Sequence, residues 1–127
     1  MRTIIVADDS NIILNVARKA FENEYNVVGV TNGEEVIKYI ETNNLSEVVG
    51  MLLDLNMPKI DGFEVLEYLK TRHLFKTIPV SIITGEDDMN NISRAFEYPI
   101  IDVLKKPFTI DNVRKIIEKT ISISEIN

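Results

Sequence analysis

The chain has 127 residues, a net charge of −6 and no cysteine, which excludes a disulfide framework and a thiolate zinc site. Hydrophobic residues make up 45% of the chain and charged residues 27%, a composition typical of one ordinary globular domain rather than a disordered or fibrous chain. Its Lys and Arg residues are scattered rather than clustered, so nucleic acid is not expected as a direct partner.

Short apolar runs and amphipathic stretches alternate from the first residues onward. Residues 3–7 predict a strand, and apolar residues at helical spacing follow over positions 13–21. Residues 26–30 predict a second strand. The next helix has Asn32 as its predicted N-cap, with Glu35 three residues on. Its inner face is predicted to carry Val36, Ile37 and Ile40.

The second half of the chain continues the alternation. A third strand is predicted over residues 48–53, a fourth over 79–83 and a fifth over 101–104. Helices are predicted after each, around Val65 to Leu69, over residues 90–96, and after a Thr109 cap. The last helix should turn Val113, Ile116 and Ile117 inward. We take residues 1–122 as one domain and residues 123–127 as a C-terminal tail.

Alternating strands and helices with apolar strands predict a parallel sheet covered by helices on both faces. The expected fold is therefore α/β, a flavodoxin-like doubly wound (βα)5 architecture with a five-stranded parallel sheet in the order 2-1-3-4-5. In such sheets ligands bind beyond the carboxyl ends of the strands, where the strand order reverses. This places the expected site between strands 1 and 3.

Charged and polar residues stand at those strand ends. Asp8 and Asp9 follow the first strand, and Asp54 follows the third. Thr84 ends the fourth strand and Lys106 follows the fifth. Three neighbouring carboxylates repel one another unless a cation offsets their charge, and an all-oxygen ligand set suits Mg²⁺. A hydroxyl and an ammonium on the other side leave room for a dianion, which predicts a phosphoryl site with an aspartate nucleophile.

These residues lie in four motifs: IIVADDS, LLDLNMPKIDGFEVL, VSIITGE and VLKKPF. Together, in this order and at this spacing, they resemble the receiver domains of two-component response regulators over nearly the whole chain, including the chemotaxis receiver protein. The resemblance implies that Asp54 accepts a phosphoryl group from a partner histidine kinase, a phosphotransfer protein or a small acyl phosphate. Phosphorylation would then control an output domain or a downstream protein.

The resemblance also implies roles for individual residues. Asp8, Asp9, Asp54 and the backbone carbonyl of Asn56 would hold Mg²⁺, and Thr84 and Lys106 rather than Lys105 would contact the phosphoryl group. The protein would be a phosphoacceptor switch, not an enzyme in the usual sense, that assists its own phosphorylation and its own autodephosphorylation.

In the family, residues at the positions of Asn56 and Glu86 flank the path of the hydrolytic water, which implies a lifetime of the phosphorylated form in the range of seconds to minutes.

Two positions depart from the family pattern. Val103 stands where many receivers carry an aromatic residue, so the usual aromatic rotamer switch is not expected. Pro99 precedes the fifth strand in place of a small pair of residues, and should reshape the connection from the fourth helix. The face formed by helix 4, strand 5 and helix 5 is still the expected output surface.

Two other classes of function fit less well. A phosphatase resembling the haloacid dehalogenase superfamily would also use an Asp nucleophile and Mg²⁺, but that family carries a second acid two residues later, where this chain has Asn56. A degenerate binding module would have lost an acid or the lysine, and neither is lost. The opening MRTIIVADDS becomes acidic too soon for a signal peptide, and no apolar run approaches the ~20 residues of a membrane span. We therefore expect a cytoplasmic protein with no membrane partner.

Overall fold

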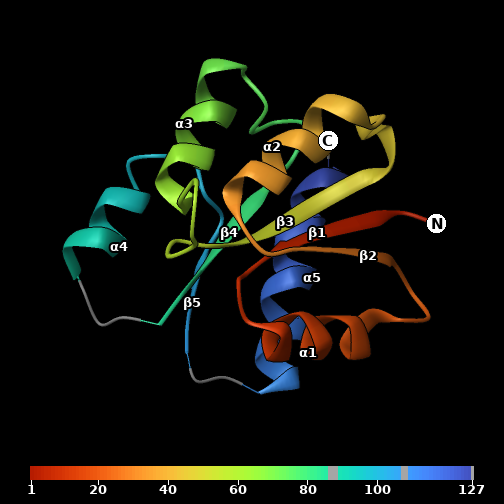
Figure 1. Ribbon diagram of the computed structural model, residues 1–127. Helices are drawn as coiled ribbons and strands as arrows, with labels where there is room; N and C mark the ends of the chain where they lie inside the picture. The colour runs from red at the N-terminus through yellow and green to blue at the C-terminus, as the bar shows by residue number, and fades with distance from the viewer. Residues whose placement is uncertain (86–88, 107–108, 127) are drawn as a thin grey trace.

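The computed structural model describes residues 1–85, 89–106 and 109–126, with side chains as far as Ile123. Within this part of the chain, parallel strands form one sheet in the order β2-β1-β3-β4-β5 (Figure 1), which confirms the predicted order. The strands are β1 (Thr3–Ala7), β2 (Asn26–Val30), β3 (Val48–Asp54), β4 (Val80–Thr84) and β5 (Val103–Lys105). The helices are α1 (Asn11–Phe21), α2 (Gly33–Thr42), α3 (Gly62–Thr71), α4 (Met89–Ala95) and α5 (Ile110–Ile126), with a short 3₁₀ helix η1 (Leu45–Glu47) before β3.

The sheet is covered by helices on both faces, and each face has its own apolar core (Figure 1). One core joins the sheet to α2, α3 and α4, and includes Val36, Leu66 and Ala95. The other joins the sheet to α1 and α5, and includes Leu14 and Ile117. Every residue of the central strands β1, β3 and β4 is buried, as expected for a parallel sheet packed on both faces.

Side-chain caps fix where the helices begin. The Asn32 side chain accepts a hydrogen bond from the Glu35 N–H at 2.9 Å, which confirms the predicted N-cap of α2. At α3, Asp61 and Glu64 form a reciprocal capping box. Thr109 caps α5 by accepting from the Asn112 N–H at 3.2 Å. These caps satisfy backbone N–H groups in the first turn of each helix.

Several details differ from the predictions. β3 ends at Asp54 rather than at residue 53, and α4 covers Met89–Ala95 instead of residues 90–96. β4 begins at Val80 rather than at residue 79, because Pro79 has no N–H to contribute to a ladder. β5 covers Val103–Lys105 instead of residues 101–104. The Ile100 N–H bonds the Tyr98 carbonyl at 2.8 Å in a tight turn around Pro99, so regular strand geometry starts only after this turn.

A further difference concerns the inner face of α2. Val36 and Ile40 are buried as predicted, but Ile37 is only half-buried. Its side chain lines a surface groove between α2 and α3 together with Ile60 and Tyr68. The apolar stripe of α2 is therefore narrower than its sequence pattern indicates, because α3 covers one side of the helix only.

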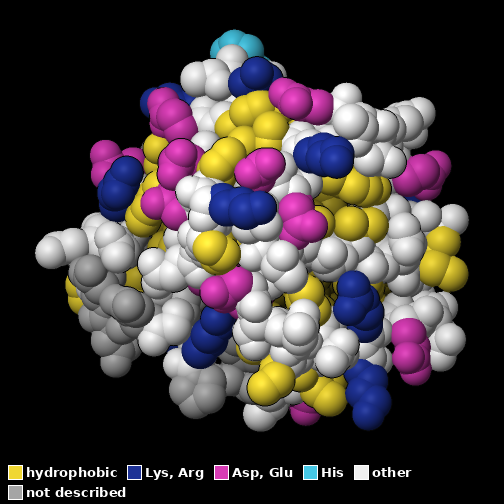
Figure 2. All heavy atoms as spheres, in the orientation of Figure 1, with side chains coloured by type: hydrophobic (Ala, Val, Ile, Leu, Met, Phe, Trp, Pro, Cys, Tyr) yellow, Lys and Arg dark blue, Asp and Glu magenta, His cyan; other side chains and the backbone are white. Residues whose placement is uncertain are grey.

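The surface carries both signs of charge. On the face shown in Figure 2, Lys and Arg side chains lie among Asp and Glu side chains rather than in a separate basic patch. α5 extends to Ile126, and the predicted domain boundary at residue 122 stays a prediction. Among the helices that the structure describes, none has the combination of length and apolar character needed to cross a bilayer.

Candidate functional site

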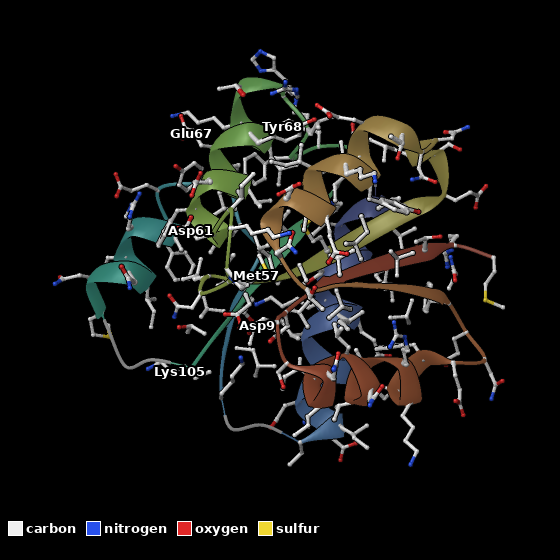
Figure 3. The ribbon with its side chains drawn as sticks, viewed as in Figure 1. Asp9, Met57, Asp61, Glu67, Tyr68 and Lys105 are labelled. Atoms are coloured by element: carbon white, nitrogen blue, oxygen red, sulfur yellow. The ribbon has the colours of Figure 1, made fainter. Side chains whose placement is uncertain are left out.

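The carboxyl ends of β1 and β3 bring two buried carboxylates together. In the parallel pairing of these strands, Ala7 lies opposite Leu53, so the residues that follow, Asp8 and Asp54, stand at the same level. Asp8 is fully buried and Asp54 is 2% exposed. Asp9 is exposed, and one carboxylate oxygen from each of the three acids lies within 4.8 Å of the others. Figure 3 shows Asp9 at this edge of the sheet.

Backbone amides orient the two buried carboxylates. The Ser10 N–H donates to Asp8 Oδ1 at 2.9 Å, and the Asn56 N–H donates to Asp54 Oδ1 at 3.1 Å. Each donor lies two residues after its acceptor, the geometry of an Asx turn. The same short-range turn therefore occurs at both strand ends and holds one oxygen of each carboxylate.

Lys106 supplies the positive charge at the site. Its Nζ lies 3.1 Å from Asp8 Oδ2 and 3.3 Å from Asp54 Oδ2, so one ammonium joins the carboxylates of β1 and β3. Lys105 is exposed and pairs in the sheet with Thr84. Because successive side chains of an extended chain point to opposite sides, only one of the two lysines can face the acids. The choice of Lys106 over Lys105 is consistent with this geometry.

Burial and charge shift the pKa values of the central pair. Desolvation raises the pKa of Asp54 to about 6, the neighbouring charge of Asp8 acts in the same direction, and the Asn56 N–H and Lys106 oppose it. Burial by itself lowers the pKa of Lys106, but its contacts with Asp8 and Asp54 outweigh that effect and raise it. At neutral pH Asp54 is therefore mostly ionised and Lys106 is cationic.

The site residues fit a hard divalent cation. Asp8 Oδ2 is buried and accepts no hydrogen bond from the residues that the structure describes, although the ammonium of Lys106 lies beside it. A buried carboxylate oxygen that lacks a hydrogen bond is costly unless a cation compensates it. Mg²⁺ binds oxygen ligands at about 2.1 Å, which places adjacent ligands about 3 Å apart, so the oxygens of Asp8, Asp9 and Asp54, within 4.8 Å of one another, would draw closer together around the ion.

The other predicted site residues also lie at this edge of the sheet. Thr84 is the last residue of β4 and is buried, and its carbonyl accepts from the Lys106 N–H at 2.8 Å. Asn56 is exposed and lies two residues after the end of β3. Glu86, predicted to flank the water path, lies outside the described residues. Sequence reasoning did not single out the Ser10 N–H as a partner of Asp8, although Asp followed two residues later by Ser at a strand end is a turn signal.

Comparisons with known proteins agree with this geometry. The family model of the response regulator receiver domain matches residues 4–118. The chain is 29% identical over 126 residues to the alkaline phosphatase synthesis transcriptional regulatory protein PhoP of Bacillus subtilis (strain 168), covering 98% of this chain and 50% of that protein. It is 30% identical over 118 residues to the DNA-binding transcriptional regulator NtrC of Escherichia coli (strain K12), covering 93% of this chain and 24% of that protein. The chain thus spans half or less of the length of these relatives.

Two solved structures show how closely the fold is shared. The receiver domain of the Francisella response regulator 1452 is 29% identical, with a TM-score of 0.80 and coverage of 100% of both chains. The receiver domain of a putative Luxo repressor protein from Vibrio parahaemolyticus has a TM-score of 0.86 at 20% identity, with 99% and 95% coverage. At 20% identity, the likeness to the second structure shows a shared fold alone. With the family model matching most of the chain, this protein belongs to the response regulator receiver domains of two-component systems.

Proposed function

We propose that this domain is a phosphorylation switch in which a partner histidine kinase or phosphotransfer protein transfers a phosphoryl group to Asp54 in a Mg²⁺-dependent reaction. The observation that carries the proposal is the single ammonium of Lys106 between two buried carboxylates, 3.1 Å from Asp8 and 3.3 Å from Asp54. This arrangement places a nucleophile and a fixed positive charge at the strand edge where α/β proteins of this kind bind ligands.

Asp8, Asp9, Asp54 and the backbone carbonyl of Asn56 would hold Mg²⁺. The support is the close grouping of the three acids, two of which are buried. When bound, Mg²⁺ supplies charge compensation for these carboxylates and for the oxygens of the incoming phosphoryl group. The ligand set is all oxygen, as Mg²⁺ prefers.

The chain's own residues account for the transfer itself. A pKa of about 6 leaves the Asp54 carboxylate ionised at neutral pH, so an oxygen of this group can attack the phosphorus atom. The new P–O bond forms as the bond to the donor's nitrogen breaks, and the electron pair of that bond stays on the donor. The Asn56 N–H keeps the Asp54 carboxylate in one orientation. The Lys106 ammonium then pairs with the phosphoryl oxygens, in a charge-assisted contact stronger than a neutral one.

The output of the switch would use the face of α4, β5 and α5. Thr84 is tied to β5 in two ways, because it pairs with Lys105 and its carbonyl accepts from the Lys106 N–H. A shift of Thr84 toward a phosphoryl group would therefore move β5 through the backbone. Val103 is a half-buried β-branched residue. It has too few rotamers to replace the rotamer switch that an aromatic side chain provides at this position. Residues 86–88, which follow Gly85 after the end of β4, lie outside the described residues.

The partner on the output side is also part of the proposal. PhoP and NtrC are named as transcriptional regulators, NtrC as a DNA-binding one, so a DNA-binding output domain is one form that the output could take. The prediction of no nucleic-acid partner is not supported for a longer protein of that kind. The predicted cytoplasmic location and the short lifetime of the phosphorylated form stay predictions.

Intact-mass measurement after incubation with acetyl phosphate tests the central proposal. We expect one added phosphoryl group in the presence of Mg²⁺, and none in excess EDTA or in Asp54→Asn. Asp102→Asn is the matched control, because Asp102 is a half-buried Asp paired with Lys119 at 3.1 Å, and it should be modified like the wild-type protein. A phosphoryl adduct that survives in Asp54→Asn, or that forms equally well in EDTA, would overturn the assignment.

Amide hydrogen exchange tests the output route separately. Beryllofluoride, which mimics the phosphoryl group, should change protection within residues 84–98 and in β5. Val103→Ala should leave most of that change intact if the backbone carries the signal. Loss of the response in Val103→Ala would show instead that the Val103 side chain transmits the change.

A further inference from the structure

The amino end of α2 lies directly against the loop that follows Asp54. Gly33, the first residue of α2, donates its N–H to the Ile60 carbonyl at 2.9 Å. A Cβ built on Gly33 would lie 2.2 Å from that carbonyl oxygen and 2.7 Å from Ile60 Cγ2. Backbone cannot swing aside as the end of a flexible side chain can, so a side chain at position 33 would have to push α2 and this loop apart.

The loop between β3 and α3, residues 55–61, is closed on itself as well. The Gly62 N–H donates to the Leu55 carbonyl at 3.0 Å across its base. Leu55 and Met57 are buried on either side of the exposed Asn56. Figure 3 labels Met57 and Asp61 within this segment, between the strand edge and the start of α3. The position of Asn56 is thus set by how this loop packs.

One residue of the loop is in a conformation that needs support. Lys59 has φ of 65°, in the left-handed region that non-glycine residues rarely adopt. The next residue, Ile60, accepts the hydrogen bond from the Gly33 N–H through its carbonyl. A strained residue persists when its surroundings over-determine it, and the hydrogen bond from α2 is one such constraint.

We propose that Gly33 is a positioning residue for the metal and phosphoryl site, because its N–H and its missing side chain hold the β3–α3 loop in the shape that presents the Asn56 carbonyl beside the acids. This inference rests on the proposed Mg²⁺ site. If it holds, α2 contributes to the affinity for Mg²⁺ although this helix supplies no ligand. Groups that orient metal ligands from outside commonly account for about 10- to 100-fold in affinity.

Helix propensity makes the opposite prediction for a substitution here. Ala is a better helix former than Gly, so Gly33→Ala would stabilise α2 if only local propensity mattered. Gly29 offers a matched control, because a Cβ there would meet Arg18 Nη2 at 2.6 Å, the end of a long side chain that can move away. Ile117→Val is a second control, which weakens the core under α5 on the opposite face of the sheet.

Calorimetric titration with Mg²⁺ on the full chain gives the first test. We expect Gly33→Ala to bind Mg²⁺ about tenfold more weakly than the wild-type protein, while Gly29→Ala and Ile117→Val bind it as the wild-type protein does. An unchanged Mg²⁺ affinity in a folded Gly33→Ala would overturn the inference and leave the proposed function intact. Equal weakening in Ile117→Val would overturn it too, since general destabilisation would then be the cause. Absence of Mg²⁺ binding in the wild-type protein would refute the proposed function itself.

A second measurement uses the wild-type protein and does not depend on whether a variant folds. Because coupling between two sites is reciprocal, Mg²⁺ should strengthen the hydrogen bond between α2 and the loop. We expect amide exchange of Gly33 to slow on Mg²⁺ addition by more than that of Asn43, whose N–H donates to Tyr39 at the other end of the same helix at 3.1 Å. Equal slowing at both ends of α2 would reject the positioning role.

Discussion

Replacing Asp54 by asparagine in the metal-free protein removes a buried carboxylate whose pKa is raised from its usual 3.8 to about 6. A carboxylate with a raised pKa in the folded state binds its proton more tightly there than in the unfolded chain. Its contribution to the free energy of unfolding is therefore fully present below pH 4 and is lost as the pH rises through about 6. Above that pH the folded protein contains an unfavourable negative charge, which Asp54→Asn removes.

The size of the effect follows from the pKa difference of about two pH units. At about 1.4 kcal/mol for each unit, the ionisation of Asp54 can lower the free energy of unfolding by at most about 3 kcal/mol. Screening by solvent, which reaches the partly exposed Lys106 beside Asp54, reduces this to about 1–2 kcal/mol. Lys106 keeps its ion pair with Asp8 in the variant. Any fixed cost of placing an amide in the site is the same at every pH, so it cancels when the two proteins are compared across a pH series.

Urea unfolding in EDTA at pH 4.5, 5.5, 6.5 and 7.5 measures this difference. We expect the stability of Asp54→Asn relative to the wild-type protein to improve by about 1–2 kcal/mol from the lowest to the highest pH. Asp111→Asn, at an exposed position in the first turn of α5, should show no such trend. Mg²⁺ should then raise the free energy of unfolding of the wild-type protein at pH 7.5 by more than that of Asp54→Asn, because the wild-type protein binds it more tightly. A difference between Asp54→Asn and the wild-type protein that does not vary with pH would refute the reasoning.

Four further substitutions test three other parts of the structure by urea unfolding in EDTA at pH 7.5. Lys106→Met leaves the two buried carboxylates without their cation and should cost about 1–3 kcal/mol, with Mg²⁺ restoring most of the loss; a variant as stable as the wild-type protein would contradict this. Lys59→Gly relieves a φ of 65° and should gain about 0.5 kcal/mol after the entropy cost of glycine is subtracted, whereas a loss would show that the side chain matters. The buried hydroxyls of Ser81 and Thr120 lie 2.5 Å apart, and Thr120 also donates to a helix carbonyl. Ser81 is therefore the donor in the bond between the two hydroxyls. Thr120→Val leaves the Ser81 hydroxyl without this partner and should cost more than Ser81→Ala, about 2 against 1 kcal/mol; the reverse order would contradict this assignment of donor and acceptor.

Local patterns in the sequence predicted the alternation of strands and helices, the order of the strands and the acids at the strand ends. The alternation of apolar runs and amphipathic stretches predicted the sheet order, because parallel strands with short connections leave few other topologies. The acids at the ends of β1 and β3 were recognisable because a charge that closes an apolar strand is unusual. The same local reasoning placed the caps Asn32 and Thr109, since a cap depends on residues only three positions away.

Only the tertiary structure decided features that depend on residues far apart in the chain. The contact between Gly33 and Ile60 leaves no periodic signal, because it joins a helix start to a loop 27 positions later. Ile37 fits the apolar pattern of α2 but is half-buried, since α3 covers only part of that helix. The raised pKa of Asp54 likewise depends on its burial and on Asp8 and Lys106, which become neighbours only when β1, β3 and the end of β5 meet. Sequence patterns report local preference, whereas close approach and desolvation are properties of the packed molecule.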